Sequence, residues 1–427
     1  MAAVHRLIGL ATGLYTATIA FRVATALALV QLGLSPAAIG LVLATFALVP
    51  MLLAVHGGRM VDRMGVRTPM LAGSALAAAG AAAGALWLHP ASLVLGAGAV
   101  GLGMMSFHLG MQHAAGELGG PARRTANFNL LTLGFSVSGL LGPPLVGAAI
   151  DAFGHRVAFA GTALVLAGVL AGCRRFAFDV HLPPPANRGA RLLEPPVEAS
   201  PPAEASPPVD PDDALPAARR DAPRESTFAL LGDARLRRLI AASLLASAAW
   251  DTFQFALPLH APTLGLSAAS VGLAIASFSA GSLAVRLVLP RVISRMTPTR
   301  WVQLALAICV ASYAAIPFAS NLALLMMLAF LVGVGPGIAQ PLLMTAMHGA
   351  SPPGRVGEAS GLRLTLVSAM QLALPIGLGL LATVAGSALL FWLYAAVAAA
   401  AGIVLARAHG RGGGGGGGDQ SSNGRPT

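Results

Sequence analysis

The sequence of 427 residues contains no lysine, and charged residues make up only 10% of it. A water-soluble domain carries about 25% charged residues, because its surface must be solvated. The shortage therefore excludes a soluble globular protein of this size. All 27 basic residues are arginines, and they give the chain a net charge of +11. Such a charge is typical of nucleic-acid binding, but the positions of the arginines, described below, argue against it.

Cysteine is also scarce. Cys173 and Cys309 are the two cysteines of the chain, and both lie in apolar segments. This excludes a disulfide framework and a metal site of Cys/His spacing, so we expect both to be small buried hydrophobes. We find no Ser/His/Asp set and no phosphate-binding loop. The sequence therefore predicts a protein that is not an enzyme and that uses no cofactor or metal.

Hydrophobic residues make up 56% of the chain, in blocks of about 20 residues that suit a hydrocarbon core of about 30 Å. The first block is too long for a cleavable signal and is expected to be retained. The pattern predicts an all-α membrane protein with twelve transmembrane helices. The expected spans are 7–31, 37–57, 69–88, 91–115, 127–150, 156–173, 239–261, 268–290, 301–318, 321–346, 357–384 and 387–406.

The arginines fall almost entirely on one side of these spans. With the N-terminus inside, 23 of them lie in cytoplasmic segments, and Arg156 alone lies on the opposite side. The remaining three, Arg22, Arg286 and Arg363, lie within spans. Because positive loops stay in the cytoplasm, we expect both termini there, in a bacterial inner membrane.

Two segments differ from the rest in composition. Residues 179–232 are rich in Pro, Ala, Glu and Asp and lack an apolar stripe, and residues 411–427 begin with a run of glycine. Neither can bury enough apolar surface to offset its ordering entropy. The predicted organisation is a six-helix half (1–178), a disordered cytoplasmic linker (179–232), a second six-helix half (233–410) and a disordered tail (411–427).

The two halves resemble each other at a constant offset of 232 residues. Arg6-Leu7-Ile8 recurs as Arg238-Leu239-Ile240, and Leu32-Gly33-Leu34-Ser35 recurs as Leu264-Gly265-Leu266-Ser267. Matches at the same offset continue through five successive spans. Transporters are commonly built from such repeats, with the substrate site at the interface between them. We therefore expect two halves related by a pseudo-twofold axis.

The connection between the second and third spans carries a motif of glycine, aspartate and arginine. Residues 58–67 read GRMVDRMGVR and resemble the loop signature G-x-x-x-D-R-x-G-x-R of the major facilitator family. The resemblance extends over the chain apart from the linker and tail, and it implies a secondary transporter. It also implies a cytoplasmic gate, in which Asp62 pairs with arginines and a helix N-terminus. The residues of this gate are Gly58, Asp62, Arg63, Gly65 and Arg67.

The alternative interpretation is a basic loop that serves topology only. In the second half the acid is replaced by Ser294 and the second glycine by Thr297, so the predicted gate is asymmetric.

The fifth span contains Gly142, Pro143 and Gly147, and is similar to the Gly-Pro motif of proton-coupled drug exporters. Physically, this pattern predicts a kink and a close helix interface, whether or not export is involved. Those exporters also carry an arginine in the fourth span. Here the fourth span offers His108, Gln112 and His113 instead, which puts that mode of proton coupling in doubt.

Charge inside the membrane is costly and is by default a functional hypothesis. Arg22 and Asp251 lie near mid-depth on the first and seventh spans, which line the cavity in the family that the chain resembles. Asp251 corresponds to Ile19 in the repeat, about one turn from Arg22. We expect an ion pair in which Asp251 binds the coupling proton and Arg22 holds it ionised until substrate intervenes. A permanent structural pair is the alternative.

Further polar residues occur at matched depth. His108 and Gln112 share a helix face, and His108 corresponds to Gln340 in the repeat. They mark a substrate cavity or, alternatively, interhelical hydrogen bonds. Arg286 either reaches the membrane surface or faces inward. The residues predicted to line the cavity are Arg22, His108, Gln112, Trp250, Asp251, Gln340 and Arg363.

The sequence thus favours a monomeric secondary transporter that exports a small organic solute and is driven by the proton gradient. A symporter or uniporter for uptake of a small organic anion is the alternative, because arginines outnumber aspartate within the spans. A transporter fold that acts as a sensor without transport is a second alternative. The predicted partners are a small-molecule substrate and the lipid bilayer, and not nucleic acid.

Overall fold

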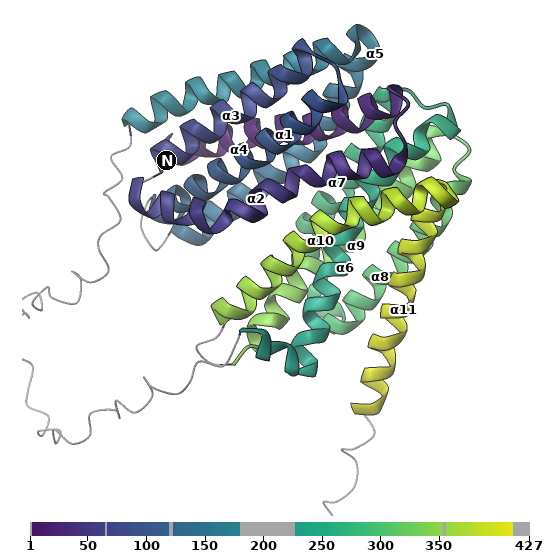
Figure 1. Ribbon diagram of the computed structural model, residues 1–427. Helices are drawn as coiled ribbons and strands as arrows, with labels where there is room; N and C mark the ends of the chain where they lie inside the picture. Colours follow the sequence, from purple (N-terminus) through teal and green to yellow (C-terminus); the bar gives the residue numbers. More distant parts are fainter. Residues whose placement is uncertain (1, 65, 119–122, 180–226, 353–355, 413–427) are drawn as a thin grey trace, which may run out of the picture.

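The computed structural model describes residues 2–64, 66–118, 123–179, 227–352 and 356–412, and these residues form helices without any strand (Figure 1). The α-helices are α1 (Ala2–Gln31), α2 (Pro36–Met64), α3 (Arg67–Leu86), α4 (Pro90–Glu117), α5 (Arg124–Asp179), α6 (Ala234–His260), α7 (Ala268–Val292), α8 (Pro298–Ala315), α9 (Leu322–Ala350), α10 (Val356–Ala385) and α11 (Ala388–Gly412). Four short 3-10 helices are η5 (Thr227–Gly232), η6 (Ala261–Leu264), η7 (Ile293–Arg295) and η8 (Ile316–Phe318).

The helices begin where the sequence supplies short polar residues. Asn321 accepts a hydrogen bond from the backbone N–H of Leu324, and Asp233 accepts from those of Arg235 and Leu236. Such caps satisfy N–H groups that the first helical turn leaves unpaired. The two bonds to Asp233 lower the pKa of its carboxyl group.

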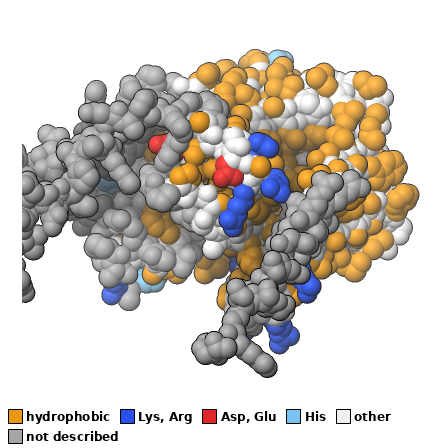
Figure 2. Space-filling model, turned by 90° about the horizontal axis from the view of Figure 1, so that it is seen from below, with side chains coloured by type: hydrophobic (Ala, Val, Ile, Leu, Met, Phe, Trp, Pro, Cys, Tyr) orange, Lys and Arg blue, Asp and Glu red, His pale blue; other side chains and the backbone are white. Residues whose placement is uncertain are grey.

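Among the described residues, nine helices are long and apolar enough to cross a membrane. Leu95, Leu164 and Val384 are more than two-thirds exposed, as expected for side chains that face lipid rather than water. Figure 2 views the molecule from below and shows a hydrophobic flank, with arginines gathered at the near end. The chain is a multi-pass membrane protein.

Helix α5 contains one interruption. Gly154 has φ 81° and ψ 171°, a conformation that glycine adopts without the strain of a side chain. It falls in the predicted connection between the spans 127–150 and 156–173. The preceding residues keep helical dihedral angles through Pro143 and Pro144.

The helices gather into two bundles, α1–α5 and α6–α11, which converge where α2 begins and α10 ends (Figure 1). Two glycines allow this close approach. A Cβ atom on Gly40 of α2 would collide with the carbonyl oxygen of Pro375 in α10. A Cβ atom on Gly272 of α7 would collide with that of Pro143 in α5. The two contacts are equivalent under the 232-residue offset, so the repeat extends from the sequence to the packing.

The same end contains two equivalent hydrogen-bonded contacts. The carboxylate of Asp151 accepts from the backbone N–H groups of Ala268 and Ala269, at 3.0 and 2.8 Å. At the matching position the hydroxyl of Thr383 accepts from the N–H of Ala37, at 3.1 Å. We call these contacts and the two glycine contacts the closed seam.

The structure differs from the sequence-based prediction at the end of the linker. Thr227–Gly232 form η5, and Leu230 is only 4% exposed because it packs against Leu236 and Ile240 of α6. Asp179 belongs to α5. Residues 180–226 and 413–427 lie outside the described residues, so a disordered linker and tail stay predictions.

The predicted cytoplasmic gate also stays a prediction. Helix α2 continues through Gly58, Asp62 and Arg63, but their side chains, like Gly65 as a whole, are outside the described part of the structure. Arg67 begins α3 and is exposed.

Candidate substrate cavity and its ion pair

A cavity of about 640 Å³ lies between the two bundles. Side chains of α1, α2, α4 and α5 form one wall, and those of α6, α7, α9 and α10 form the other. Its lining includes the exposed Met51 and Leu364 but none of the closed-seam residues. The cavity is therefore open toward one end and blocked at the other. The open end is the end at which α6 begins and α7 finishes, and it carries the exposed Arg235, Arg238 and Arg291.

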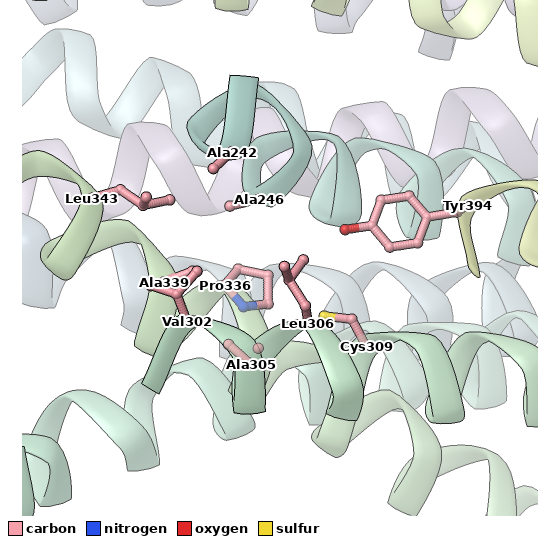
Figure 3. A pocket seen from close by; sticks show the side chains of 11 residues that line it. Ala242, Ala246, Val302, Ala305, Leu306, Cys309, Pro336, Ala339, Leu343 and Tyr394 are labelled. Atoms are coloured by element: carbon pink, nitrogen blue, oxygen red, sulfur yellow. The ribbon is translucent and has the colours of Figure 1, made fainter. Parts of the chain in front are cut away.

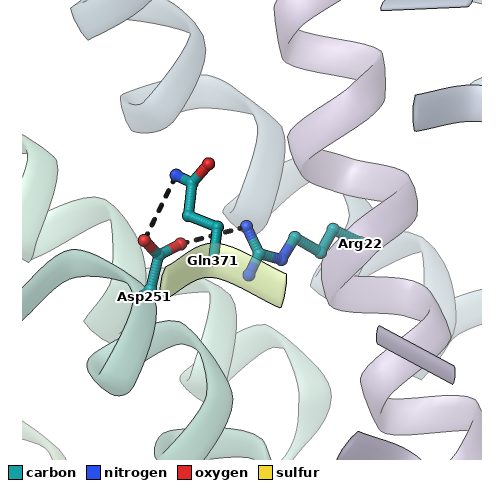
Figure 4. Close-up of polar contacts among 3 residues, drawn as sticks. All are labelled: Arg22, Asp251 and Gln371. Atoms are coloured by element: carbon teal, nitrogen blue, oxygen red, sulfur yellow. Dashed lines mark hydrogen bonds and ion pairs between the residues drawn. The ribbon is translucent and has the colours of Figure 1, made fainter. Parts of the chain in front are cut away.

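An ion pair joins the two bundles inside this cavity. Arg22 Nη1 of α1 lies 3.3 Å from Asp251 Oδ1 of α6 (Figure 4). The Asp251 side chain is 2% exposed and that of Arg22 is 24% exposed. Gln371 of α10 donates from Nε2 to the other carboxylate oxygen of Asp251, at 3.3 Å. We call Arg22, Asp251 and Gln371 the charged layer.

The burial of the pair sets its chemistry. A buried carboxylate is tolerated when a cation and further donors satisfy it, and it becomes costly when one partner is removed. Arg22 comes from one bundle, whereas Asp251 and Gln371 come from the other. A movement of the bundles at this depth therefore changes the partners of Asp251, and a proton or a substrate can compensate the change.

A second polar group lies on the α1 and α4 wall. The Tyr15 hydroxyl is hydrogen-bonded to His108 Nδ1, and Gln112 Nε2 donates to His108 Nε2 at 2.6 Å. Since an amide nitrogen only donates, His108 Nε2 accepts, and its proton sits on Nδ1 toward Tyr15. Tyr15 also packs edge-on against Phe135, with ring centroids 5.2 Å apart.

The opposite wall offers aromatic surface. Trp250 of α6 and Phe278 of α7 both line the cavity and meet edge to face, with centroids 4.8 Å apart. Such a pair provides an angled apolar surface for a ring or a chain of a bound molecule.

The structure brings most of the predicted cavity residues together. Arg22, His108, Gln112, Trp250, Asp251 and Gln340 all line the cavity.

Arg363 is placed elsewhere: it is not among the lining residues, and its Nε donates to Ser243 on α6. The sequence did not decide whether Arg286 reaches the membrane surface or faces inward. It lines the cavity and donates to Ser136 Oγ at 3.1 Å.

Two functional candidates were missed by sequence reasoning. Gln371 corresponds to Gly139 in the repeat, so the duplication gives no signal for it. Gln254 corresponds to Arg22 and lines the cavity, and its buried amide has no hydrogen-bond partner among the described residues. The sequence did offer one signal for Gln371 and Gln254, since each is a side-chain amide within an apolar span.

The predicted kink residues of the fifth span act in packing. A Cβ atom on Gly142 would crowd the carbonyl oxygen of Thr16, and one on Gly147 would collide with that of Ala268. Pro143 presents its carbonyl to Gly272 across the closed seam. The motif therefore lies at an interface between the bundles.

A much smaller gap lies inside the second bundle, between Ala246, Cys309, Pro336 and Tyr394 (Figure 3). Its volume is about 10 Å³, room for about one water molecule at most. It is a packing defect in an apolar core, too small for a solute.

Comparisons with known proteins agree with this architecture. A nucleoside transporter, NupG, has a TM-score of 0.72 at 12% identity, covering 95% of this chain and 99% of that chain. A POT family transporter in complex with a thioalcohol-conjugated peptide has a TM-score of 0.70 at 12% identity, covering 96% of each chain. A peptide transporter POT in complex with sulfate has a TM-score of 0.68 at 17% identity, covering 96% of this chain and 94% of that chain. At these identities the likeness shows the fold alone.

A search of curated proteins finds no match. The family model described as Major Facilitator Superfamily matches residues 7–375 and, in a second match, residues 239–413. The chain therefore belongs to the major facilitator superfamily.

Proposed function

We propose that this protein is a secondary active transporter that moves a small organic solute by alternating access and uses the proton gradient to drive export. The observation that carries the proposal is the cavity of about 640 Å³ between two repeated bundles, with an ion pair that joins them. In such an arrangement, rocking of the bundles exposes the cavity to one side of the membrane at a time.

The proposed membrane arrangement is twelve spans in two halves of six, in a bacterial inner membrane, with both termini in the cytoplasm. The interruption of α5 at Gly154 supports this count, since it divides α5 into two helices. Exposed arginines at the open end support a cytoplasmic location for that end. In this orientation the structure is the inward-facing state. The proposed transporter works as a monomer without a bound cofactor.

Asp251 is the proposed proton-exchanging group. In the inward-facing state it is held by Arg22 and Gln371, both at 3.3 Å. When the bundles rock, Arg22 moves with the first bundle and Gln371 with the second. Loss of the Arg22 contact leaves a buried carboxylate, which takes up a proton rather than remain unpaired in an apolar environment.

Export is favoured by the Gly-Pro motif of α5, which lies at the interface between bundles. Uptake of an organic anion by symport or uniport is the second candidate. The described lining favours it in one respect, since it holds Arg22 and Arg286 against a single acid, Asp251.

Growth of an overexpressing strain across an array of toxic compounds and carbon sources tests the proposal. We expect resistance or growth on at least one compound, and we expect Asp251→Asn to abolish it. Asp233→Asn is the matched control, because this acid caps α6 outside the cavity and asparagine caps equally well.

The direction follows from inside-out vesicles acidified by respiration and incubated with the compound that the array identifies, added outside. An antiporter accumulates it and a symporter does not. If Asp62→Asn and Asp251→Asn leave every flux and resistance phenotype unchanged, the sensor alternative replaces transport.

A further inference from the structure

Arg286 carries a positive charge into the cavity, and none of the described residues is an acidic partner for it. Its guanidinium lies in the lining, and its described contact is the hydrogen bond to Ser136 Oγ at 3.1 Å. Ser136 is itself 8% exposed and also donates to the carbonyl of Thr132. A hydroxyl satisfies one of the five N–H groups of arginine but leaves its charge uncompensated.

The charges of the lining therefore do not balance. Among the described lining residues, Asp251 is the one acid, and it is already paired with Arg22. The pair is neutral as a unit, so Arg286 leaves the cavity with a surplus of one positive charge. A half-buried guanidinium favours a ligand that brings the missing negative charge, and carboxylates fit its fork of donors.

The position of Arg286 also defines the length of such a ligand. Arg286 is eighteen residues from the closed-seam end of α7, about 27 Å along the helix. Arg22 is nine residues from the corresponding end of α1, about 14 Å. Arg286 thus lies about 13 Å nearer the open end than the charged layer. By the same count, Trp250 of α6 and Phe278 of α7 are each ten residues from the closed-seam end of their helix, so they line the cavity about 15 Å from that end, beside the charged layer.

We propose that the cavity binds a compact aromatic monocarboxylate, with its carboxylate on Arg286 and Ser136 and its ring against Trp250 and Phe278. The inference rests on the proposed transport function and specifies its substrate class.

The carboxylate replaces the contact between Arg286 and Ser136, which come from α7 and α5 and hence from different bundles. A ligand held by both bridges the two walls at the open end. Its ring reaches the level of Asp251, where it can perturb the charged layer.

Trp250 supplies the reporter for the test. In a Trp87→Phe, Trp301→Phe, Trp392→Phe background, Trp250 is the remaining tryptophan of the chain. The purified protein is titrated in detergent with three matched probes: 3-phenylpropanoate, 3-phenylpropanamide and 3-phenylpropylamine. We expect a saturable change in Trp250 fluorescence with the carboxylate, at a Kd at least about tenfold lower than with the amide or amine.

The variants locate the charge that matters. Arg286→Gln removes the preference for carboxylate, Arg286→Lys retains part of it, and Ser136→Ala weakens binding a few-fold. Arg300→Gln is the matched control, since this arginine is exposed at the start of α8, away from the cavity. Because the tryptophan replacements can disturb folding, thermal stabilisation of the unsubstituted protein by the same three probes gives a second measurement.

The inference is overturned by tighter or equal binding of the amide or amine, or by a carboxylate preference that survives Arg286→Gln. Absence of any saturable carboxylate binding at millimolar concentration overturns it as well. These equilibria need no gradient, so they are independent of transport. Carboxylate binding without flux would support the binding site and contradict the transport proposal. Asp251-dependent flux of neutral or cationic compounds alone would support transport and contradict the carboxylate site.

Discussion

The closed seam follows the internal repeat of the molecule, whereas the charged layer departs from it. At the closed seam, Gly40 against Pro375 is repeated as Gly272 against Pro143. In the charged layer, Arg22 corresponds to Gln254, Asp251 to Ile19 and Gln371 to Gly139. Symmetry is kept where backbones approach closely, and it is lost where buried charges are paired.

The difference has a physical basis. Two helix backbones can touch only where a side chain is absent, and a glycine in either half meets this condition equally well. A buried charge requires a partner of opposite sign, so a symmetric pair of aspartates or of arginines would be repelled rather than stabilised. One charge from each half is the arrangement that neutralises itself across the interface.

Removal of Arg22 is expected to have the largest effect. Arg22→Gln leaves Asp251, at 2% exposure, without a cation, and should lower stability by about 3 kcal/mol. Asp251→Asn should cost less, because Arg22 is 24% exposed and cavity water reaches it. Thermal unfolding in detergent measures both, and the double variant Arg22→Gln, Asp251→Asn should recover most of the loss while transport stays abolished.

Transfer of the pair to its mirror positions sharpens this result. Combining Ile19→Asp and Gln254→Arg with Asp251→Ile and Arg22→Gln places each charge on the other bundle. We expect no recovery of transport, because the donor Gln371 has Gly139 as its counterpart. Recovery would mean that the charged layer is functionally symmetric, contrary to the account above.

A side chain at the closed-seam glycines is expected to have the next largest effect. Gly40→Val and Gly272→Val each force a branched side chain against a backbone carbonyl, at about 1–3 kcal/mol of overpacking. Both should weaken the inward-facing state by similar amounts, measured as increased labelling of cysteines introduced at the seam. Gly161→Val and Gly168→Val are controls, since nothing lies within 4 Å of a Cβ atom at either glycine. Unequal effects at Gly40 and Gly272 would break the symmetry of the seam.

The capping contacts should give the smallest effect. Asp151→Ala removes two charge-assisted bonds and Thr383→Ala removes one neutral bond, so we expect about 1–2 and about 0.5–1 kcal/mol respectively. The exchange Asp151→Thr with Thr383→Asp should restore the wild-type balance of inward- and outward-facing states. The same labelling assay measures it, and failure of the exchange would show that the two caps are not interchangeable.

Sequence reasoning predicted the parts of the fold that depend on periodic or repeated signals. The apolar blocks gave helices in the right places, and the 232-residue offset correctly related Gly40 to Gly272 and Pro143 to Pro375. It also placed Arg22 and Asp251 near each other, because each lies at the same depth of an equivalent helix.

Other features of the fold and of the cavity could not be predicted from the sequence, for identifiable reasons. Arg286 and Arg363 differ in helix rotation, which one sequence does not define, and only Arg286 lines the cavity. Gln371 lacks a polar counterpart, so the repeat drew no attention to it. Leu230 packs against α6 within a segment whose composition predicts disorder, because the packing depends on neighbours far along the chain.

The central claim is that the two bundles rock about the charged layer between an inward- and an outward-facing state. Distances between spin labels at both ends test it most directly, with Cys173 and Cys309, both buried, first replaced by alanine. One label pair takes the exposed Leu32 and Val384 at the closed end, and the other takes the exposed Arg175 and Arg300 at the open end. We predict two populations. The inward-facing one has a short distance at the closed end and a long distance at the open end, and the outward-facing one has the reverse. Asp151→Ala should enrich the outward-facing population. One unchanging distance at each end, insensitive to Asp151→Ala and to Gly40→Val, would contradict the account.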